Sequence, residues 1–356
     1  MADQAPVSDH GVNDPRKAEL LSQPVEHIDI KSFDARPIVE AMRKMSFTSR
    51  DLGRAAEIYN MMLGDKDCAI ALVIAGSTSA GGCMDLYAEL VRNNMVDMIV
   101  ATGATIVDMD FFEGLGHKHY QAKTIPDDDT LRSLYIDRIY DTYIDEVALQ
   151  NVDHTIFEIA EGLEPRPYSS REFIRNMGKY LVEHGRKENS LVKLAYEHDV
   201  PIFCPAFSDS SAGFGLVKHQ VDSMRAGRRY MTLDSVADFR ELTEIKIKAG
   251  TTGLLMIGGG VPKNFIQDTV VCAEILGHDD VEVHKYAVQI TVADVRDGAC
   301  SSSTLQEAAS WGKVSTAMEQ MVFAEAGSVM PLLASDAYHR GLWKDREKRR
   351  FARMFD

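Results

Sequence analysis

Short hydrophobic runs recur along the chain, and most of them end in a segment rich in glycine, serine, threonine or aspartate. Runs without polar alternation are typical of strands that are buried on both faces of a parallel sheet. Amphipathic stretches between the runs predict helices, so strands and helices alternate as in an α/β protein. The predicted strands are residues 69–74, 98–101, 201–207, 253–257, 286–290 and 320–324.

The helical stretches have recognisable ends. Thr48 or Ser49 is expected to cap the first main helix, which stops at Gly64, and Pro262 suits the first turn of another. A helix that connects two neighbouring strands makes them parallel, so the sequence predicts a Rossmann-like open parallel sheet flanked by helices. Further helical patterns fall at residues 84–93, 137–161, 170–198 and 235–249.

The 356 residues are enough for one large domain or two fused lobes, and no linker or internal repeat divides them. We expect a peripheral N-terminal extension over residues 1–30 and a single α/β domain over residues 31–340. The basic C-terminal tail, residues 341–356, is expected to present residues 344–353 as a solvated helix face.

Composition narrows the class of protein. The net charge of -15 and the pI near 5.2 argue against nucleic acid or an anionic membrane as a partner. No apolar run is long enough to span a bilayer, and the polar N-terminus predicts no signal peptide. The five cysteines form no C-x-x-C pair, which favours reduced thiols and a cytoplasmic protein.

The loops after the strands are candidates for ligand binding, because parallel strands deliver them to one edge of the sheet. Gly258–Gly260, ahead of the helix with Pro262, suits a pyrophosphate, since small residues let backbone N–H groups approach phosphate. It is not the G-x-G-x-x-G pattern of standard dinucleotide sites. Asp108 and Asp209, near strand ends, are candidates to bind ribose hydroxyls or, equally, to cap turns and helices.

Two other patterns are not interpreted as a metal site or a catalytic site. His117 and His119 lack a carboxylate or cysteine at ligand spacing, so we expect no metal. The serines at 301–303 lack the G-x-S-x-G pattern of a serine hydrolase.

A lone lysine is ordinarily a solvated surface residue, yet the surroundings of Lys313 suggest more. It ends the segment 310–313, Ser-Trp-Gly-Lys, downstream of the glycine turn and a further strand. That order favours a lysine that faces a nucleotide and acts as a covalent catalyst. A lysine attacks only as the neutral amine, and burial beside Trp311 would disfavour the ammonium form.

Together these residues resemble the deoxyhypusine synthase family, over about residues 69 to 333. The segments that carry the resemblance are residues 94–97 with 102–104, 205–209, 258–263 and 307–313. The resemblance implies a homotetramer of Rossmann-like subunits, with sites for NAD and an amine at a dimer interface. It implies hydride transfer from spermidine to NAD, loss of 1,3-diaminopropane, and a butylimine on Lys313. The aminobutyl group then passes to an acceptor amine, and NADH reduces the new imine.

The resemblance also assigns site residues. Those that would line NAD are Gly76, Ser77, Thr78, Thr102, Gly103, Ala104, Asp108, Asp209, Gly259, Ala293, Glu325 and Ala326. Glu325 stands where the family usually has aspartate, so the carboxylate is kept. Those that would line the amine are Asp108, Asn264, Glu307, Trp311 and Phe214. Glu307 would bind a substrate ammonium or be a solvated helix residue, and Trp311 would wall the alkyl chain or belong to the core.

Four positions depart from the protein-modifying members. Those members have acids at the positions of Val107, Phe214 and Cys300, and histidine at Asn264. Because a buried ammonium needs anionic partners, we expect a small amine acceptor, putrescine before spermidine, and a homospermidine-type product. Asp110 or Glu113 compensating for the lost acids is the contrary interpretation. The alternatives are a deoxyhypusine synthase that modifies a lysine of a translation factor, and a non-catalytic NAD-binding assembly protein.

Overall fold

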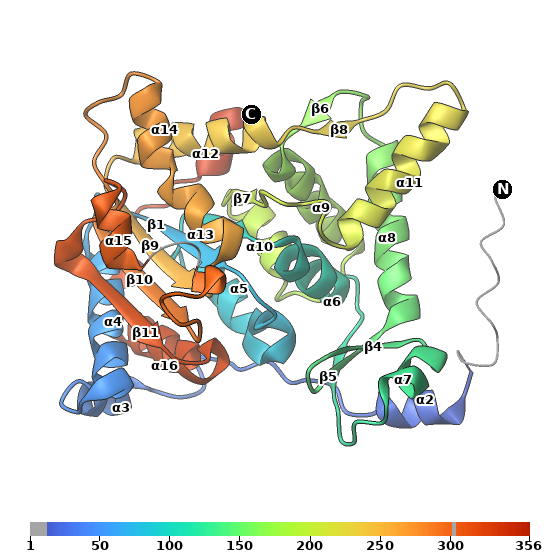
Figure 1. The fold of residues 1–356 in the computed structure, drawn as a ribbon, viewed down its shortest axis with the longest axis horizontal. Helices are drawn as coiled ribbons and strands as arrows, with labels where there is room; N and C mark the ends of the chain where they lie inside the picture. The colour runs from blue at the N-terminus through green and yellow to red at the C-terminus, as the bar shows by residue number, and fades with distance from the viewer. Residues whose placement is uncertain (1–12, 301–303) are drawn as a thin grey trace.

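A six-stranded, all-parallel sheet forms the centre of the computed structural model, which describes residues 13–300 and 304–356 (Figure 1). The strand order is β11-β10-β9-β1-β2-β7, and every neighbouring pair is parallel. The strands are β1 (Ala69–Ile74), β2 (Met98–Ala101), β7 (Ile202–Phe203), β9 (Thr252–Ile257), β10 (Tyr286–Thr291) and β11 (Glu319–Phe323). This confirms the predicted open parallel sheet flanked by helices.

Both faces of the sheet are buried, as the uninterrupted apolar runs predict. Alternate residues of β1 enter two different cores: Leu72 packs in one cluster and Val73 in the other. The first cluster lies under α3 (Arg36–Met42), α4 (Phe47–Gly64) and α16 (Ala326–Arg340). The second lies under α12 (Ser235–Ala249), α13 (Gly260–Gln267) and α15 (Leu305–Ser310), and α14 (Thr269–Ile275) packs against α12.

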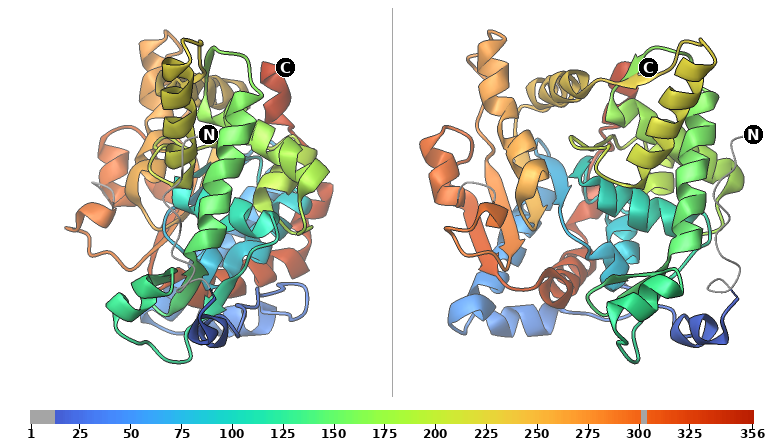
Figure 2. Two further views of the ribbon diagram at one scale, coloured as in Figure 1. Left: turned by 90° about the vertical axis from the view of Figure 1, so that its right-hand side faces the viewer. Right: turned by 45° about the vertical axis from the view of Figure 1, so that its right-hand side comes forward.

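A second group of elements extends beyond the β7 edge. It contains α5 (Met84–Arg92), α8 (Glu146–Glu161), α9 (Ser170–His184), α10 (Leu191–Glu197) and α11 (Ser211–Arg225). Figure 2 shows α8 and α11 side by side, far from β10 and β11. A small antiparallel sheet, in the order β3 (His119–Gln121), β5 (Thr142–Asp145), β4 (Ile136–Ile139), lies beside α7 (Asp128–Ser133) and α2 (Pro15–Leu20).

The remaining elements are short. They are β6 (Pro167–Tyr168) and β8 (Thr232–Leu233), the π-helices η1 (Ser79–Cys83) and η2 (Ala104–Phe111), α6 (Phe112–Gly114), and the 3-10 turns η3 (Gly298–Cys300) and η4 (Thr316–Met318). No helix among the described residues is long and apolar enough to span a membrane.

Three local predictions are wrong. Residues 137–145 form the β4–β5 hairpin rather than the start of a helix, and Tyr140 adopts a positive φ at its turn. The stretch 170–198 breaks at Gly185 into α9 and α10. Neither Thr48 nor Ser49 caps α4, because the helix already begins at Phe47.

The C-terminal tail is not a solvated helix face. It contains two 3-10 turns, η5 (Leu342–Asp345) and η6 (Phe351–Phe355), and Phe351 is buried. Between them the Arg346 guanidinium pairs with Asp97 and donates to the Asn94 carbonyl. The side chains of Arg346 and Asp97 are both buried. The tail therefore anchors itself on the turn between α5 and β2.

Candidate functional site

The loops that follow the six parallel strands meet at one edge of the sheet, which we call the strand-end edge: residues 75–78, 102–108, 204–211, 258–260, 291–293 and 324–326. Backbone hydrogen bonds join neighbouring loops. Ala75 N donates to Ile257 O at 2.9 Å, and Gly258 N donates to Ile290 O at 2.8 Å. The structure therefore brings all twelve residues of the predicted NAD set to this edge or to the first turns beyond it.

Glycines let these loops approach one another closely. Gly258 has φ +75, and a Cβ on it would lie 2.8 Å from the Ala75 carbonyl oxygen. A Cβ on Gly103 would lie 2.7 Å from the Ser210 side chain, whereas Gly76, at φ +93, has nothing within 4 Å. At these glycines the edge therefore exposes backbone atoms rather than side chains.

Several polar side chains at this edge are already engaged. Thr78 Oγ1 shares a hydrogen bond of 2.7 Å with Tyr87 OH. Both Glu325 oxygens accept bonds at the start of α16, Oε1 from Gly327 N at 2.6 Å and Oε2 from Ser328 N at 2.8 Å. Glu325 is therefore first a helix cap, which is a role that we did not assign to it from the sequence.

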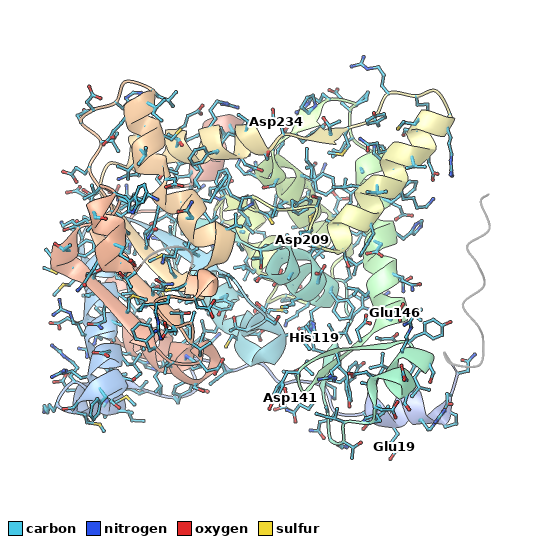
Figure 3. The ribbon with its side chains drawn as sticks, in the orientation of Figure 1. Glu19, His119, Asp141, Glu146, Asp209 and Asp234 are labelled. Carbon is cyan, nitrogen blue, oxygen red and sulfur yellow. The ribbon has the colours of Figure 1, made fainter. Side chains whose placement is uncertain are left out.

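Acidic side chains gather near the β7 end of the edge. Asp108 Oδ1 accepts from Ser211 N at 2.8 Å, and burial raises the pKa of Asp108 to about 6, helped by the neighbouring charge of Asp209. Burial likewise raises the pKa of Asp153, on α8, to about 6. Asp209 itself is exposed in the loop after β7 (Figure 3).

Lys313 takes part in a closed ring of three side chains. Its Nζ lies 2.5 Å from Asp268 Oδ1 and 3.3 Å from Asn264 Oδ1, and Asn264 Nδ2 donates to Asp268 Oδ2 at 2.7 Å. Only 13% of the Lys313 side chain is exposed. The structure thus joins the predicted Lys313 and Asn264, and it adds Asp268. The signal for Asp268 was its position four residues after Asn264, on the same face of a helix.

Lys313 is nearly buried, but Trp311, which was expected to bury it, is itself exposed. Trp311 is 70% exposed, because α15 ends at Ser310 and the indole lies outside the core. The Trp311 ring centre is 5.5 Å from Lys313 Nζ, within cation–π range. Lys313 Nζ thus has a carboxylate oxygen at 2.5 Å and an aromatic ring at 5.5 Å as neighbours.

Two other predicted amine-site residues lie outside the ring of Lys313, Asn264 and Asp268. Glu307 forms a capping box with Thr304 at the start of α15, and the hydrogen bond from the Thr304 backbone lowers the pKa of Glu307. Phe214 is 70% exposed on α11, at the other end of the sheet from α15 (Figure 1). Of the other altered positions, Val107 and Cys300 are fully buried.

A buried histidine holds the Lys313 segment against the sheet. His284 N donates to Lys313 O at 2.9 Å, and Ser315 N donates to His284 O at 2.9 Å. The imidazole bonds to Ile266 O of α13 at 3.2 Å and to Thr252 Oγ1 of β9 at 2.8 Å. Burial lowers the pKa of His284 to about 3, so the neutral ring connects the Lys313 segment to α13 and β9.

The side chains that we considered as metal ligands or as substitute acids have other partners. His119 Nδ1, at the start of β3 (Figure 3), bonds to Glu113 Oε1 at 2.7 Å. Glu113 also bonds to His27 and Lys187, whereas Asp110 accepts from two backbone N–H groups and a serine at the start of α10. Neither acid is available to an amine. Over residues 13–300 and 304–356 no group of three ligand-type side chains could hold a metal, and the serines at 301–303 lie outside the described residues.

Comparison with known proteins identifies relatives over nearly the whole chain. The family model described as deoxyhypusine synthase matches residues 37–337. A deoxyhypusine synthase-like protein from Coxiella burnetii is 71% identical over 340 residues, which cover 95% of this chain and 96% of that relative. One from Caulobacter vibrioides is 67% identical over 341 residues, 96% of this chain and 93% of the relative. The solved structure of a candidate deoxyhypusine synthase from Entamoeba histolytica covers 88% of this chain and 97% of its own, with a TM-score of 0.57 and 20% identity, and it supports the fold alone.

Proposed function

This chain belongs to the deoxyhypusine synthase family, and from that premise we propose that it is an NAD-dependent 4-aminobutyl transferase that works through an imine on Lys313. Family membership already implies a transferase. The observation that carries the proposal is the ring of Lys313, Asp268 and Asn264, because it holds one nearly buried amine beside a carboxylate and an amide.

Lys313 is the nucleophile in this proposal. Its Nζ bonds to the imine carbon of the oxidised amine, the carbon–nitrogen bond to the leaving amine breaks, and that amine takes the proton that Nζ releases. Covalent capture divides a difficult transfer into two easier steps. His284 supports the reaction indirectly, since its two backbone bonds and its neutral ring fix where the Lys313 segment lies.

The strand-end edge fits NAD. Close backbone approach at Gly258 and Gly103, and open space at Gly76, suit a cofactor whose phosphates bind backbone N–H groups. The residues that would hold it are those of the predicted set at this edge, with Asp108 and Asp209 as candidates for the ribose hydroxyls. Bound there, NAD would accept a hydride from the donor amine and return it to the product.

The acceptor that we propose is a small diamine, putrescine before spermidine, which gives a homospermidine-type product. Support comes from the loss of acids at Val107, Phe214 and Cys300, together with the full engagement of Asp110 and Glu113 elsewhere. Fewer anionic groups suit an amine with fewer ammonium groups. The alternative acceptor is a lysine of a translation factor, as in deoxyhypusine formation.

A homotetramer with shared active sites is also part of the proposal. One face of α11 exposes a line of apolar side chains, Phe214, Val217, Val221 and Met224, at helical spacing. Such a face supports contact with a second copy, which would bring Phe214 and the acids near β7 to another subunit's Lys313. Light scattering of the purified protein tests the assembly; a monomer at micromolar concentration would contradict it.

Product analysis tests the function. The protein is incubated with NAD and spermidine, then with putrescine or an unmodified translation-factor substrate as acceptor, and the products are identified by mass spectrometry. We expect homospermidine and free 1,3-diaminopropane. Efficient modification of the protein lysine with putrescine ignored would overturn the acceptor assignment, and an absence of both products would favour the non-catalytic alternative.

A further inference from the structure

Asp268 is the more exposed partner of Lys313. It joins α13 to α14 and is 32% exposed, whereas Lys313 is 13% exposed. One of its oxygens contacts Lys313 Nζ at 2.5 Å and the other accepts from Asn264 Nδ2 at 2.7 Å. The more exposed member of the pair is thus the carboxylate, which is the group that an approaching ammonium would seek.

We propose that Asp268 is the carboxylate that receives the ammonium group of the amine substrate in exchange for Lys313, so that substrate binding itself releases the nucleophile. This inference rests on the proposed function, because it concerns how an amine reaches the same lysine. It names a substrate-binding residue that the resemblance to the family did not supply.

The exchange solves a conflict in the resting site. Lys313 attacks through Nζ, yet in the resting site that nitrogen is held against Asp268 Oδ1 at 2.5 Å. When a substrate ammonium replaces Lys313 at Asp268, Nζ is freed from the carboxylate. One cation leaves the carboxylate and one arrives, so Asp268 stays paired and no bond to carbon changes in this step.

Asn264 supplies a second hydrogen-bond acceptor for the ammonium group during the exchange. Its Nδ2 donates to Asp268 Oδ2, which orients the amide so that Oδ1 faces Lys313 at 3.3 Å. After the exchange, Asn264 Oδ1 and Asp268 Oδ1 are two acceptors for the incoming ammonium. A neutral amide at position 264 is therefore matched to a carboxylate at position 268, and together they present one negative charge.

The other acids that we had considered do not offer this contact. Glu307 caps α15 through Thr304, and Asp110 and Glu113 have their own partners. Binding through a single carboxylate next to Lys313 suits an amine with few charged groups. Asp268 would then hold the nitrogen beside the carbon that Lys313 attacks.

The test compares Asp268→Asn with wild-type protein, with Glu274→Gln as a matched control. Glu274 is an exposed acid on α14, so its change removes the same charge from the same segment. Titration calorimetry measures putrescine and spermidine binding without NAD, and steady-state assays give KM and kcat. Loss of a charge-assisted hydrogen bond should raise Kd and KM for the amine about 10- to 100-fold in Asp268→Asn, with a smaller fall in kcat. Glu274→Gln should match wild type, and Asp268→Glu should recover part of the affinity.

Unchanged amine binding and KM in Asp268→Asn would overturn the inference, as would a fall in kcat alone, because that is what a purely structural residue gives. If Asp268→Asn does not fold, Asp268→Ser carries the same comparison. Wild-type protein that binds neither amine also overturns it. Failure of the proposed function looks different: the wild-type protein would bind amines, lose that binding in Asp268→Asn, and still release no 1,3-diaminopropane.

Discussion

At Lys313 the protein keeps a primary amine in contact with a carboxylate rather than against an apolar wall. The side chain is nearly buried, but Asp268 and Asn264 supply polar partners at 2.5 and 3.3 Å. In the mechanism that we propose, reactivity therefore depends on what displaces the carboxylate, and not on the indole of Trp311, which is largely exposed.

Substitution of Lys313 by arginine tests separately the positive charge of the side chain and its ability to act as a nucleophile. Lys313→Arg keeps a cation beside Asp268 but should abolish aminobutyl transfer, because a guanidinium is never neutral at working pH. Its melting temperature should stay close to that of wild-type protein, since the ion pair is retained. Product formation and thermal unfolding are measured together; transfer by Lys313→Arg at more than a trace of the wild-type rate would exclude Lys313 as nucleophile.

The buried acids near β7 make stability depend on pH. Burial raises the pKa of Asp153 to about 6, above the ordinary value of 3.8 for an aspartate, so folding favours the protonated carboxyl. This contribution is full below the unfolded pKa and is lost as pH rises through about 6. Asp153→Asn should therefore stabilise the protein at about pH 8 more than at about pH 5, as measured by urea unfolding. An equal effect at both pH values would contradict the raised pKa.

At the scale of elements, β1 and β2 were predictable to the residue, because strands buried on both faces are continuous apolar runs. The β4–β5 hairpin was not, since its turn needs a positive φ at Tyr140 and its pairing depends on β3.

Part of the site followed from motifs, namely Lys313 and Asn264. Asp268 and His284 were missed because their roles depend on how α13, β9 and the Lys313 segment pack together, which local sequence does not encode.

The glycine turn after β9 can be tested against a matched glycine. Gly258→Ala would combine positive φ with a Cβ 2.8 Å from Ala75 O, whereas Gly277, at φ +88, has open space around it. Gly277→Ala should cost about 1 kcal/mol of unfolding free energy from backbone strain alone. Gly258→Ala should cost more, by about 1–3 kcal/mol, and should weaken NAD binding as measured by calorimetry. Equal stability and NAD affinity in the two variants would remove close loop approach as a feature of the site.

At the scale of the whole molecule, the first residues that the structure describes and the C-terminal tail are both tied to the body of the protein. Residues 13–30 reach the antiparallel sheet and Glu113, through Lys17 paired with Asp145 and His27 paired with Glu113. The C-terminal tail crosses the turn before β2, where Arg346 meets Asp97. The predicted boundaries at residues 30 and 340 stay predictions.

The contact between Arg346 and Asp97 predicts how much the C-terminal tail adds to the unfolding free energy. Arg346→Ala leaves the buried Asp97 carboxylate without its cation and should lower the unfolding free energy by about 3–5 kcal/mol. Arg349→Ala is the control, because Arg349 is half-buried and donates a hydrogen bond of 2.9 Å to the Lys66 carbonyl, whose loss leaves no buried charge behind. Its effect should stay within about 0.5 kcal/mol. Similar urea midpoints for the two variants would mean that the tail contributes little to the fold.

The most direct test of the account is to trap the intermediate. Wild-type protein is mixed with NAD and spermidine, reduced with borohydride, digested, and analysed by peptide mass spectrometry. The account predicts one added aminobutyl unit on the peptide that contains Lys313, and none in Lys313→Arg. Label on another lysine, or no label while 1,3-diaminopropane is released, would contradict it.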